Sequence, residues 1–258
     1  MSETTEHKIP KLLKIKDYIT LLGTTLGIIA LICAFFGTNE FISFGFFLIS
    51  VSIGTDMIDG YIARKTKTVN EMGKELDSLS DSLTFGITPA ILTYLAFKTD
   101  TIFDIFVIIG AICFAIGAML RLARFNIEEN LGYTGLPTPV SALMLITYFY
   151  ANYFYSIATG DFFIASSFII PFIMILIGWF NITTYLHFGA KHKGTYIFFV
   201  LIAPLCPIFG IIGISSPNFL TSVISSIIFL GFFLLIMFFI IRGFYIYQMS
   251  KRKTATTA

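Results

Sequence analysis

Two short stretches dominate the interpretation of this chain: Asp56-Met-Ile-Asp59-Gly60-Tyr-Ile-Ala63-Arg64 and, eight residues later, Gly73-Lys-Glu-Leu-Asp77-Ser-Leu-Ser-Asp81. Each contains a pair of aspartates, three residues apart in the first stretch and four apart in the second. On an α-helix these spacings place both aspartates of a pair on one face, one turn apart. Two such faces that meet would form an oxygen-rich cage, which suits a hard divalent cation.

The composition places both stretches in a membrane protein. Hydrophobic residues make up 56% of the 258 residues and charged residues only 12%, and the mean hydropathy is +0.86. This usage excludes an ordinary soluble globular domain. Residues 194–241 carry no charge, and this run is long enough for two spans because one span needs about 20 residues. The net charge of +2 gives no indication of a nucleic-acid partner.

The apolar segments predict an all-α, polytopic membrane protein with about eight transmembrane helices. We expect these helices near residues 18–37, 41–64, 74–97, 101–125, 138–158, 162–186, 195–213 and 219–247. They would form a single catalytic domain, 18–249, which contains the aspartate stretches at 56–81. Residues 1–17 and the basic segment 250–258 are expected to be solvated tails.

The basic residues predict how this arrangement is oriented. With the N-terminus in the cytoplasm, all but one of the 17 Lys and Arg residues fall on the cytoplasmic side, the exception being Lys98. Cytoplasmic segments of membrane proteins carry such an excess, and an odd number of helices would break the alternation. We therefore expect both termini in the cytoplasm and the aspartates at the cytoplasmic face of the cell membrane.

The two stretches together resemble the signature of the CDP-alcohol phosphotransferases, D-x2-D-G-x2-A-R-x8-G-x3-D-x3-D. All eight fixed positions are matched with the family's spacing. The resemblance implies an integral-membrane enzyme of phospholipid synthesis whose donor is a CDP-lipid, either CDP-diacylglycerol or CDP-archaeol. It also implies a homodimer.

The predicted roles of the aspartates follow from the negative charge of such a donor. Carboxylates at helix ends often serve only interfacial solvation, but ionisable residues within a membrane usually mark functional sites. We predict that Asp56, Asp59 and Asp77 bind Mg²⁺ or Mn²⁺, with Ca²⁺ as an alternative, because a divalent cation neutralises a diphosphate. The resemblance assigns Asp81 the role of general base for the acceptor hydroxyl, with a shared metal contact.

The small and basic residues of the signature are expected to bind the CDP-lipid. Gly60, Ala63 and Gly73 would let the nucleotide approach the helix backbone, although small residues also serve helix packing in membranes. Arg64 can pair with a phosphate or anchor its helix at the cytoplasmic boundary.

Asp59 and Asp77 would contribute to the donor site as well as to the metal site, and one further residue belongs to this prediction. Family members commonly carry Thr-x-x-Asn early in the first helix, whereas this chain has Thr20-Leu-Leu-Gly23. Only Thr20 therefore remains as a candidate there.

Two tracts further along the chain resemble the phosphatidylserine synthase branch of the family: Arg121-Leu-Ala-Arg124-Phe-Asn126 and Thr134-Gly135-Leu136-Pro137-Thr138-Pro139. The resemblance implies L-serine as the acceptor. Two arginines three residues apart on a helix can point the same way, and a guanidinium group suits a carboxylate. The predicted serine pocket comprises Arg121, Arg124, Asn126, Gly135, Pro137 and Thr138. Alternatively, the arginines only anchor a helix end.

Two other functions remain open at this point. The signature does not identify the acceptor, so the same chemistry could act on glycerol 3-phosphate, an inositol phosphate or another small alcohol. A cation transporter could use the four aspartates as its ion site. Transporter sites tend to lie near the bilayer midplane, whereas these aspartates are predicted at the cytoplasmic boundary.

Overall fold

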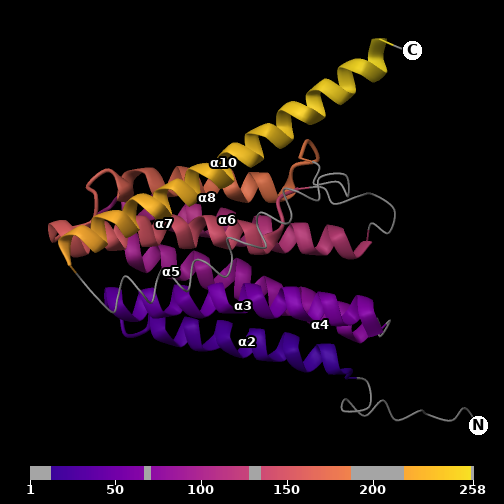
Figure 1. The fold of residues 1–258 in the computed structure, drawn as a ribbon, viewed down its shortest axis with the longest axis horizontal. Helices are drawn as coiled ribbons and strands as arrows, with labels where there is room; N and C mark the ends of the chain where they lie inside the picture. Colours follow the sequence, from indigo (N-terminus) through magenta and orange to yellow (C-terminus); the bar gives the residue numbers. More distant parts are fainter. Residues whose placement is uncertain (1–12, 67–70, 128–134, 187–217, 257–258) are drawn as a thin grey trace, which may run out of the picture.

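The computed structural model of the chain describes residues 13–66, 71–127, 135–186 and 218–256. Within these ranges every regular element is a helix, which confirms the predicted all-α fold. The elements are α2 (Ile15–Ala34), α3 (Asn39–Thr66), α4 (Glu71–Asp81), the π-helical segment η1 (Ser82–Ile87), α5 (Thr88–Phe97), α6 (Asp104–Ile127), α7 (Thr138–Thr159), α8 (Ser166–Ile182) and α10 (Phe219–Thr256). They run along the long axis of the molecule, and the C-terminal part of α10 extends beyond the bundle (Figure 1).

The helices correspond to seven of the eight predicted segments, with α4, η1 and α5 together forming one of them. The remaining prediction, 195–213, lies outside the described residues. In the described part of the chain, four helical stretches are long and apolar enough to cross a membrane: Ile15–Ala34, Asn39–Ala63, Asp104–Ile127 and Phe219–Met249. These stretches support a membrane protein, and the number of spans stays a prediction.

The helix α7 lies at the centre of the bundle, and its side chains from Val140 to Phe154 are all buried. It joins α3 to α10 through stacked aromatic rings. The ring of Phe149 lies 4.5 Å from that of Phe46 on α3, and the ring of Tyr150 lies 5.0 Å from that of Phe229 on α10. Large apolar side chains buried on both sides make α7 the core on which the other helices pack.

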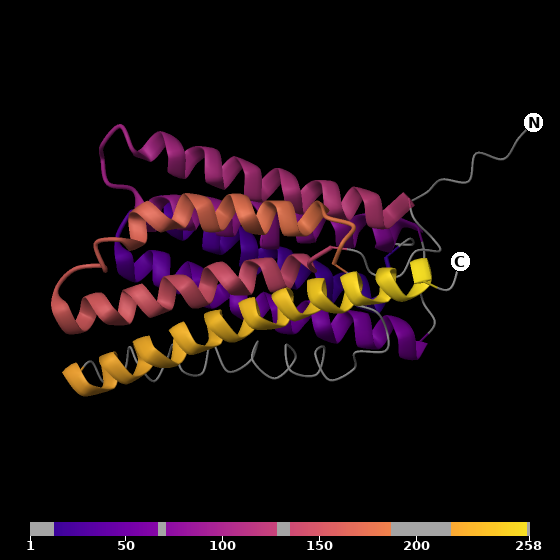
Figure 2. The same ribbon diagram turned by 90° about the horizontal axis from the view of Figure 1, so that it is seen from above.

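The outer helices expose apolar rather than polar surface. Along α6, which lies at one edge of the bundle in Figure 2, Ile105, Ile109, Ile112 and Ile116 are all exposed. A surface of this kind is unfavourable in water, whereas in a bilayer the helix backbone is satisfied internally and apolar side chains face lipid. The exposed residues therefore agree with the membrane assignment.

The predicted helix 74–97 is interrupted by one π-helical turn directly after Asp81. The backbone N–H of Thr88 bonds to the carbonyl of Leu83, five residues earlier. Pro89 follows and has no N–H to donate to the carbonyl of Phe85, which favours the wider turn. Such turns occur frequently at functional sites.

The structure corrects the boundaries of both predicted tails. The helix α2 begins at Ile15, so Lys16 and Asp17 belong to its first turn and are buried rather than solvated. The carboxylate of Asp17 accepts the backbone N–H of Lys14 at 2.6 Å and caps the helix. At the other end, α10 continues to Thr256 through most of the predicted tail. Charged side chains are compatible with a helical backbone, so boundaries set by hydropathy can make a helix too short at its ends.

Candidate active site

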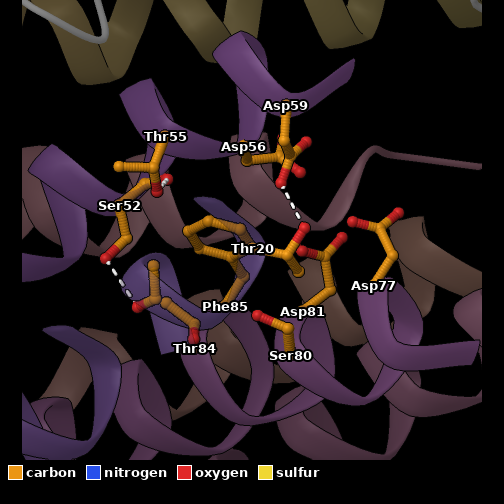
Figure 3. A pocket seen from close by; sticks show the side chains of 11 residues that line it. Thr20, Ser52, Thr55, Asp56, Asp59, Asp77, Ser80, Asp81, Thr84 and Phe85 are labelled. Carbon is orange, nitrogen blue, oxygen red and sulfur yellow. Dashed lines mark hydrogen bonds between the residues drawn. The ribbon is translucent and has the colours of Figure 1, made fainter. Parts of the chain in front are cut away.

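Three aspartates from two helices converge near one end of the bundle. Asp56 and Asp59 lie on α3, and Asp77 lies on α4. One carboxylate oxygen of each lies within 4.8 Å of the others, and Figure 3 shows these side chains around a common space. Asp59 is buried, and the other two are half-buried. The convergence of α3 and α4 therefore brings together the three residues predicted as metal ligands.

The donor set fits a hard divalent cation. Every donor is a carboxylate oxygen, the type that Mg²⁺, Mn²⁺ and Ca²⁺ prefer. Two oxygens bound to one such ion can be at most twice the metal–oxygen distance apart, or about 4–5 Å. The three carboxylate oxygens lie within 4.8 Å of one another, which is close to this limit. Three close carboxylates repel one another in a partly buried place, and a bound cation would relieve this repulsion.

Thr20 connects α2 to this cluster. Its hydroxyl is buried and donates a hydrogen bond to Oδ2 of Asp59 at 2.7 Å. A hydroxyl in this position fixes which carboxylate oxygen faces the neighbouring aspartates. The incomplete Thr-x-x-Asn pattern had left Thr20 as a candidate donor contact, and the structure places it against a predicted metal ligand.

Asp81 lies beside the cluster but is not one of the three aspartates whose oxygens converge. It is buried, with an exposed fraction of 9%. The hydroxyl of Thr138, at the start of α7, donates to Oδ2 of Asp81 at 3.4 Å, and Nη1 of Arg121 on α6 donates to the Thr138 hydroxyl at 3.4 Å. Arg121 also interacts electrostatically with Asp81. Asp81 thus interacts with the neighbouring aspartates Asp56 and Asp77 and also with side chains of α6 and α7.

A small pocket lies among the four aspartates and the neighbouring helices. Beyond the aspartates its lining is rich in hydroxyl groups, which come from α2, α3, α4 and η1. The other lining residues are Thr20, Gly23, Ser52, Thr55, Ser80, Thr84 and Phe85 (Figure 3). Polar groups inside an apolar bundle are costly unless they are satisfied, so this lining suits a polar ligand group. Apart from Thr20 and Gly23, sequence reasoning did not single out these residues, because isolated Ser and Thr are common in membrane helices.

Gly23 replaces the asparagine that family members commonly carry, and the structure shows what occupies the space. A Cβ atom added to Gly23 would lie 2.6 Å from Oγ1 of Thr55 on α3. Ser52 also approaches this glycine, donating its hydroxyl to the Gly23 carbonyl at 3.2 Å. The absence of a side chain on α2 is therefore matched by hydroxyl groups on α3.

The predicted serine pocket is divided by the structure. Arg121 and Thr138 lie beside Asp81, as described above. Arg124 instead donates from Nη1 to the carbonyl of Ile182 at 2.7 Å, where α8 ends. The backbone N–H of Gly135 bonds to the carbonyl of Leu186 at 2.9 Å, and its φ of +81° is one that glycine adopts without strain. Arg124 therefore ties α6 to the end of α8, and Gly135 ties the segment before α7 to the chain after α8.

The remaining predicted residues lie on the same helices around the cluster. The amide Nδ2 of Asn126 donates to Oγ of Ser78 on α4 at 2.9 Å, which ties the end of α6 to the helix that carries Asp77 and Asp81. Pro137 is the N-cap residue of α7 and directly precedes Thr138.

The small residues of the signature extend the two aspartate helices. Gly60 and Ala63 continue along α3 beyond Asp59 and are half-buried, and Gly73 is buried on α4. Arg64 belongs to α3, but its side chain lies outside the described part of the structure.

Sequence reasoning missed the pair Lys16 and Asp17. Nζ of Lys16 lies 2.7 Å from Oδ1 of Asp17, and both side chains are almost fully buried. Lys16 interacts electrostatically with Asp59 and Asp77. The available signal was the spacing of Lys16 and Thr20, because residues i and i+4 share a helix face.

Comparisons with known proteins show the family to which the chain belongs. Residues 13–186 match the family model of the CDP-alcohol phosphatidyltransferases. The chain is 41% identical over 138 residues to a CDP-diacylglycerol–serine O-phosphatidyltransferase of Methanocaldococcus jannaschii, covering 54% of this chain and 61% of that protein. It is 34% identical over 155 residues to an archaetidylserine synthase of Methanothermobacter thermautotrophicus, covering 58% of this chain and 64% of that protein.

A Bacillus subtilis protein, also described as a CDP-diacylglycerol–serine O-phosphatidyltransferase, is 39% identical over 94 residues, or 35% of this chain and 51% of its own length. The matches to these relatives thus span between half and two thirds of each relative's length. The family model matches more than half of the chain and includes all four aspartates. The chain therefore belongs to the CDP-alcohol phosphatidyltransferase family.

Proposed function

We propose that this protein transfers a phosphatidyl-type group from a CDP-lipid to the hydroxyl of L-serine and releases CMP. The observation that carries the proposal is a site in which four aspartates line one pocket but have different contacts. Three aspartates converge, and the fourth, Asp81, also accepts a hydrogen bond from Thr138. Transfer to a hydroxyl needs both a place for a charge-neutralising cation and a base near the acceptor. The names of the relatives support serine as the acceptor.

In this proposal Asp56, Asp59 and Asp77 hold Mg²⁺ or Mn²⁺, with Ca²⁺ as the alternative. The bound cation would neutralise the diphosphate and position its leaving group. Asp59 and Asp77 also border the donor, and Thr20 keeps the Asp59 carboxylate oriented through its 2.7 Å hydrogen bond.

Asp81 is the proposed general base. It accepts the proton of the serine hydroxyl while the serine oxygen forms a bond to the phosphorus that carries the lipid. The bond from this phosphorus to the bridging oxygen breaks, and CMP leaves with that oxygen. Thr138 orients Asp81 by its hydrogen bond, and Arg121 supplies a cation beside Asp81 that can attract the serine carboxylate.

The other predicted binding residues keep their proposed roles. Gly60, Ala63, Arg64 and Gly73 would border the nucleotide of the donor. For the acceptor, Arg124, Asn126, Gly135 and Pro137 are proposed to frame the pocket from outside. The hydrogen bonds of Arg124, Asn126 and Gly135 support this, because they tie neighbouring segments together.

We further propose that the protein is a homodimer in the cell membrane, with eight spans, both termini in the cytoplasm and the site at the cytoplasmic face. The four long apolar helices support the membrane location. The donor would be CDP-diacylglycerol or CDP-archaeol, because relatives with names of both kinds match the chain.

The decisive experiment is a transfer assay with purified protein in detergent and radiolabelled L-serine. Each CDP-lipid is supplied in turn with Mn²⁺ or Mg²⁺, and parallel reactions contain glycerol 3-phosphate or an inositol phosphate in place of serine. We expect a labelled lipid and an equal amount of CMP with serine only. Turnover of another acceptor without turnover of serine would refute the serine assignment. Cation flux into reconstituted vesicles without any CMP release would favour a transporter instead.

A further inference from the structure

Lys16 is a buried cation that no step above uses. Its ion pair with Asp17 is 2.7 Å long, and the exposed fractions of the two side chains are 8% and 0%. The exposed residue Lys14, by contrast, lies only two positions earlier at the same helix end. Lysine is rarely buried in this way unless it has a partner or a function.

The position of Lys16 on α2 directs it towards the donor side of the site. Thr20 lies one turn later on the same face, and its hydroxyl contacts both the Lys16 carbonyl, at 3.2 Å, and the Asp59 carboxylate, at 2.7 Å. Lys16 interacts electrostatically with Asp59 and Asp77, and Asp17 interacts with Asp77. Lys16 is therefore ion-paired with Asp17 and lies one helical turn before the residue that bonds to Asp59.

Two positively charged side chains, Arg121 and Lys16, interact with different aspartates of the site. Arg121 lies beside Asp81, where the acceptor hydroxyl is proposed to react. Lys16 interacts electrostatically with Asp59 and Asp77, which border the proposed diphosphate position. A substrate with two negatively charged phosphates would thus meet a positive charge on the side away from the acceptor.

Stability alone does not account for the pair of Lys16 and Asp17. Removing two charges from water is costly, and a buried ion pair often contributes no more than apolar residues of similar size. Neighbouring residues on a helix also do not face each other, so the two side chains have to bend to meet. An ammonium group that is already desolvated and held near a cation site is suited to binding phosphate.

We propose that Lys16 binds the diphosphate of the nucleotide donor and that Asp17 is the positioning residue that holds its ammonium group in place. The inference rests on the proposed function, because it assumes a nucleoside diphosphate as the donor head group. Lys16 donates hydrogen bonds to phosphate oxygens, and Asp17 limits the positions that its flexible side chain can take.

The test measures binding of CDP and of cytidine to the detergent-purified protein at saturating Mn²⁺. The variants are Lys16→Met, the double variant Lys16→Met/Asp17→Asn and the control Lys14→Met. The double variant removes both charges of the pair, so it leaves no buried carboxylate without its cation and does not change the net charge. We expect both Lys16 variants to bind CDP about tenfold more weakly or worse, since a hydrogen bond to a charged group is lost. Cytidine affinity and the Lys14 control should stay at the wild-type level.

The outcomes separate this inference from the proposed function. A double variant that binds CDP as the wild type does would overturn the role of Lys16 and would leave the ion pair as simple charge compensation. Equal losses for CDP and cytidine, or a double variant that does not fold, would make the pair a structural element and would also overturn it. Wild-type protein that fails to bind CDP at all would instead refute the proposed function.

Discussion

The hydrogen bond from Thr20 to Asp59 offers the sharpest test of the site, through the substitution Thr20→Val. Valine keeps the β-branched shape and removes only the hydroxyl, which donates to Oδ2 of Asp59 at 2.7 Å in a buried position. Loss of a hydrogen bond to a charged group costs about 1.5–3 kcal/mol, which corresponds to roughly a 10- to 150-fold change in a dissociation constant. Loss of a group that orients a metal ligand typically costs about 10- to 100-fold in metal affinity.

The assay is a titration of the purified protein with Mn²⁺, with free Mn²⁺ followed by electron paramagnetic resonance. We expect Thr20→Val to weaken Mn²⁺ binding by about 10- to 100-fold. Thr24→Val is the matched control, because Thr24 lies one turn later on α2 and donates to the uncharged hydroxyl of Ser80 at 2.6 Å. The control should bind Mn²⁺ almost as the wild type does. Unchanged Mn²⁺ affinity in Thr20→Val, or an equal loss in Thr24→Val, would refute the role assigned to Thr20.

Three further predictions concern other parts of the site. Asp81→Asn should abolish transfer to serine while CDP affinity stays within about threefold of the wild type, since a general base contributes to the reaction rather than to donor binding. Strongly weakened CDP binding in equilibrium measurements would contradict this prediction. Gly23→Asn, which restores the family's common residue, should reduce activity and thermal stability because its Cβ would overlap Oγ1 of Thr55. Adding Thr55→Ala to the same chain should recover part of both, and lack of recovery would argue against this contact. Arg121→Lys should raise the KM for serine more than Arg124→Lys does, because Arg121 interacts with Asp81 whereas Arg124 bonds to the end of α8. The reverse order of the two KM values in steady-state kinetics would indicate that Arg124 binds serine.

Much of the fold could be predicted because hydropathy and helical spacing are local properties. The helices α3, α6, α7 and α10 begin within a few residues of their predicted starts. The π-helical turn could not be predicted in the same way. It depends on the missing N–H of Pro89 and on how η1 packs against α2 and α6, and the apolar pattern of residues 82–97 is compatible with an uninterrupted helix.

The candidate site was predictable to the extent that its residues repeat at helical spacing. The separations of three and four residues placed Asp56 with Asp59 and Asp77 with Asp81 on shared faces. The same reasoning grouped Arg121 with Arg124, and here it was incomplete, because the two guanidinium groups bond to different segments. A shared helix face limits direction only to a broad arc, and long side chains within it can select different partners.

The sequence by itself determined that the chain is helical and apolar, that it carries the family signature, and which aspartates share a face. These properties depend on residues within one or two turns of each other. Only the tertiary structure decided that Thr20 meets Asp59, 39 residues away, that Thr138 meets Asp81, 57 residues away, and that Arg124 reaches Ile182, 58 residues away. Such contacts depend on which helix faces pack together, and the packing is set by the summed fit of many side chains rather than by the spacing within any one helix.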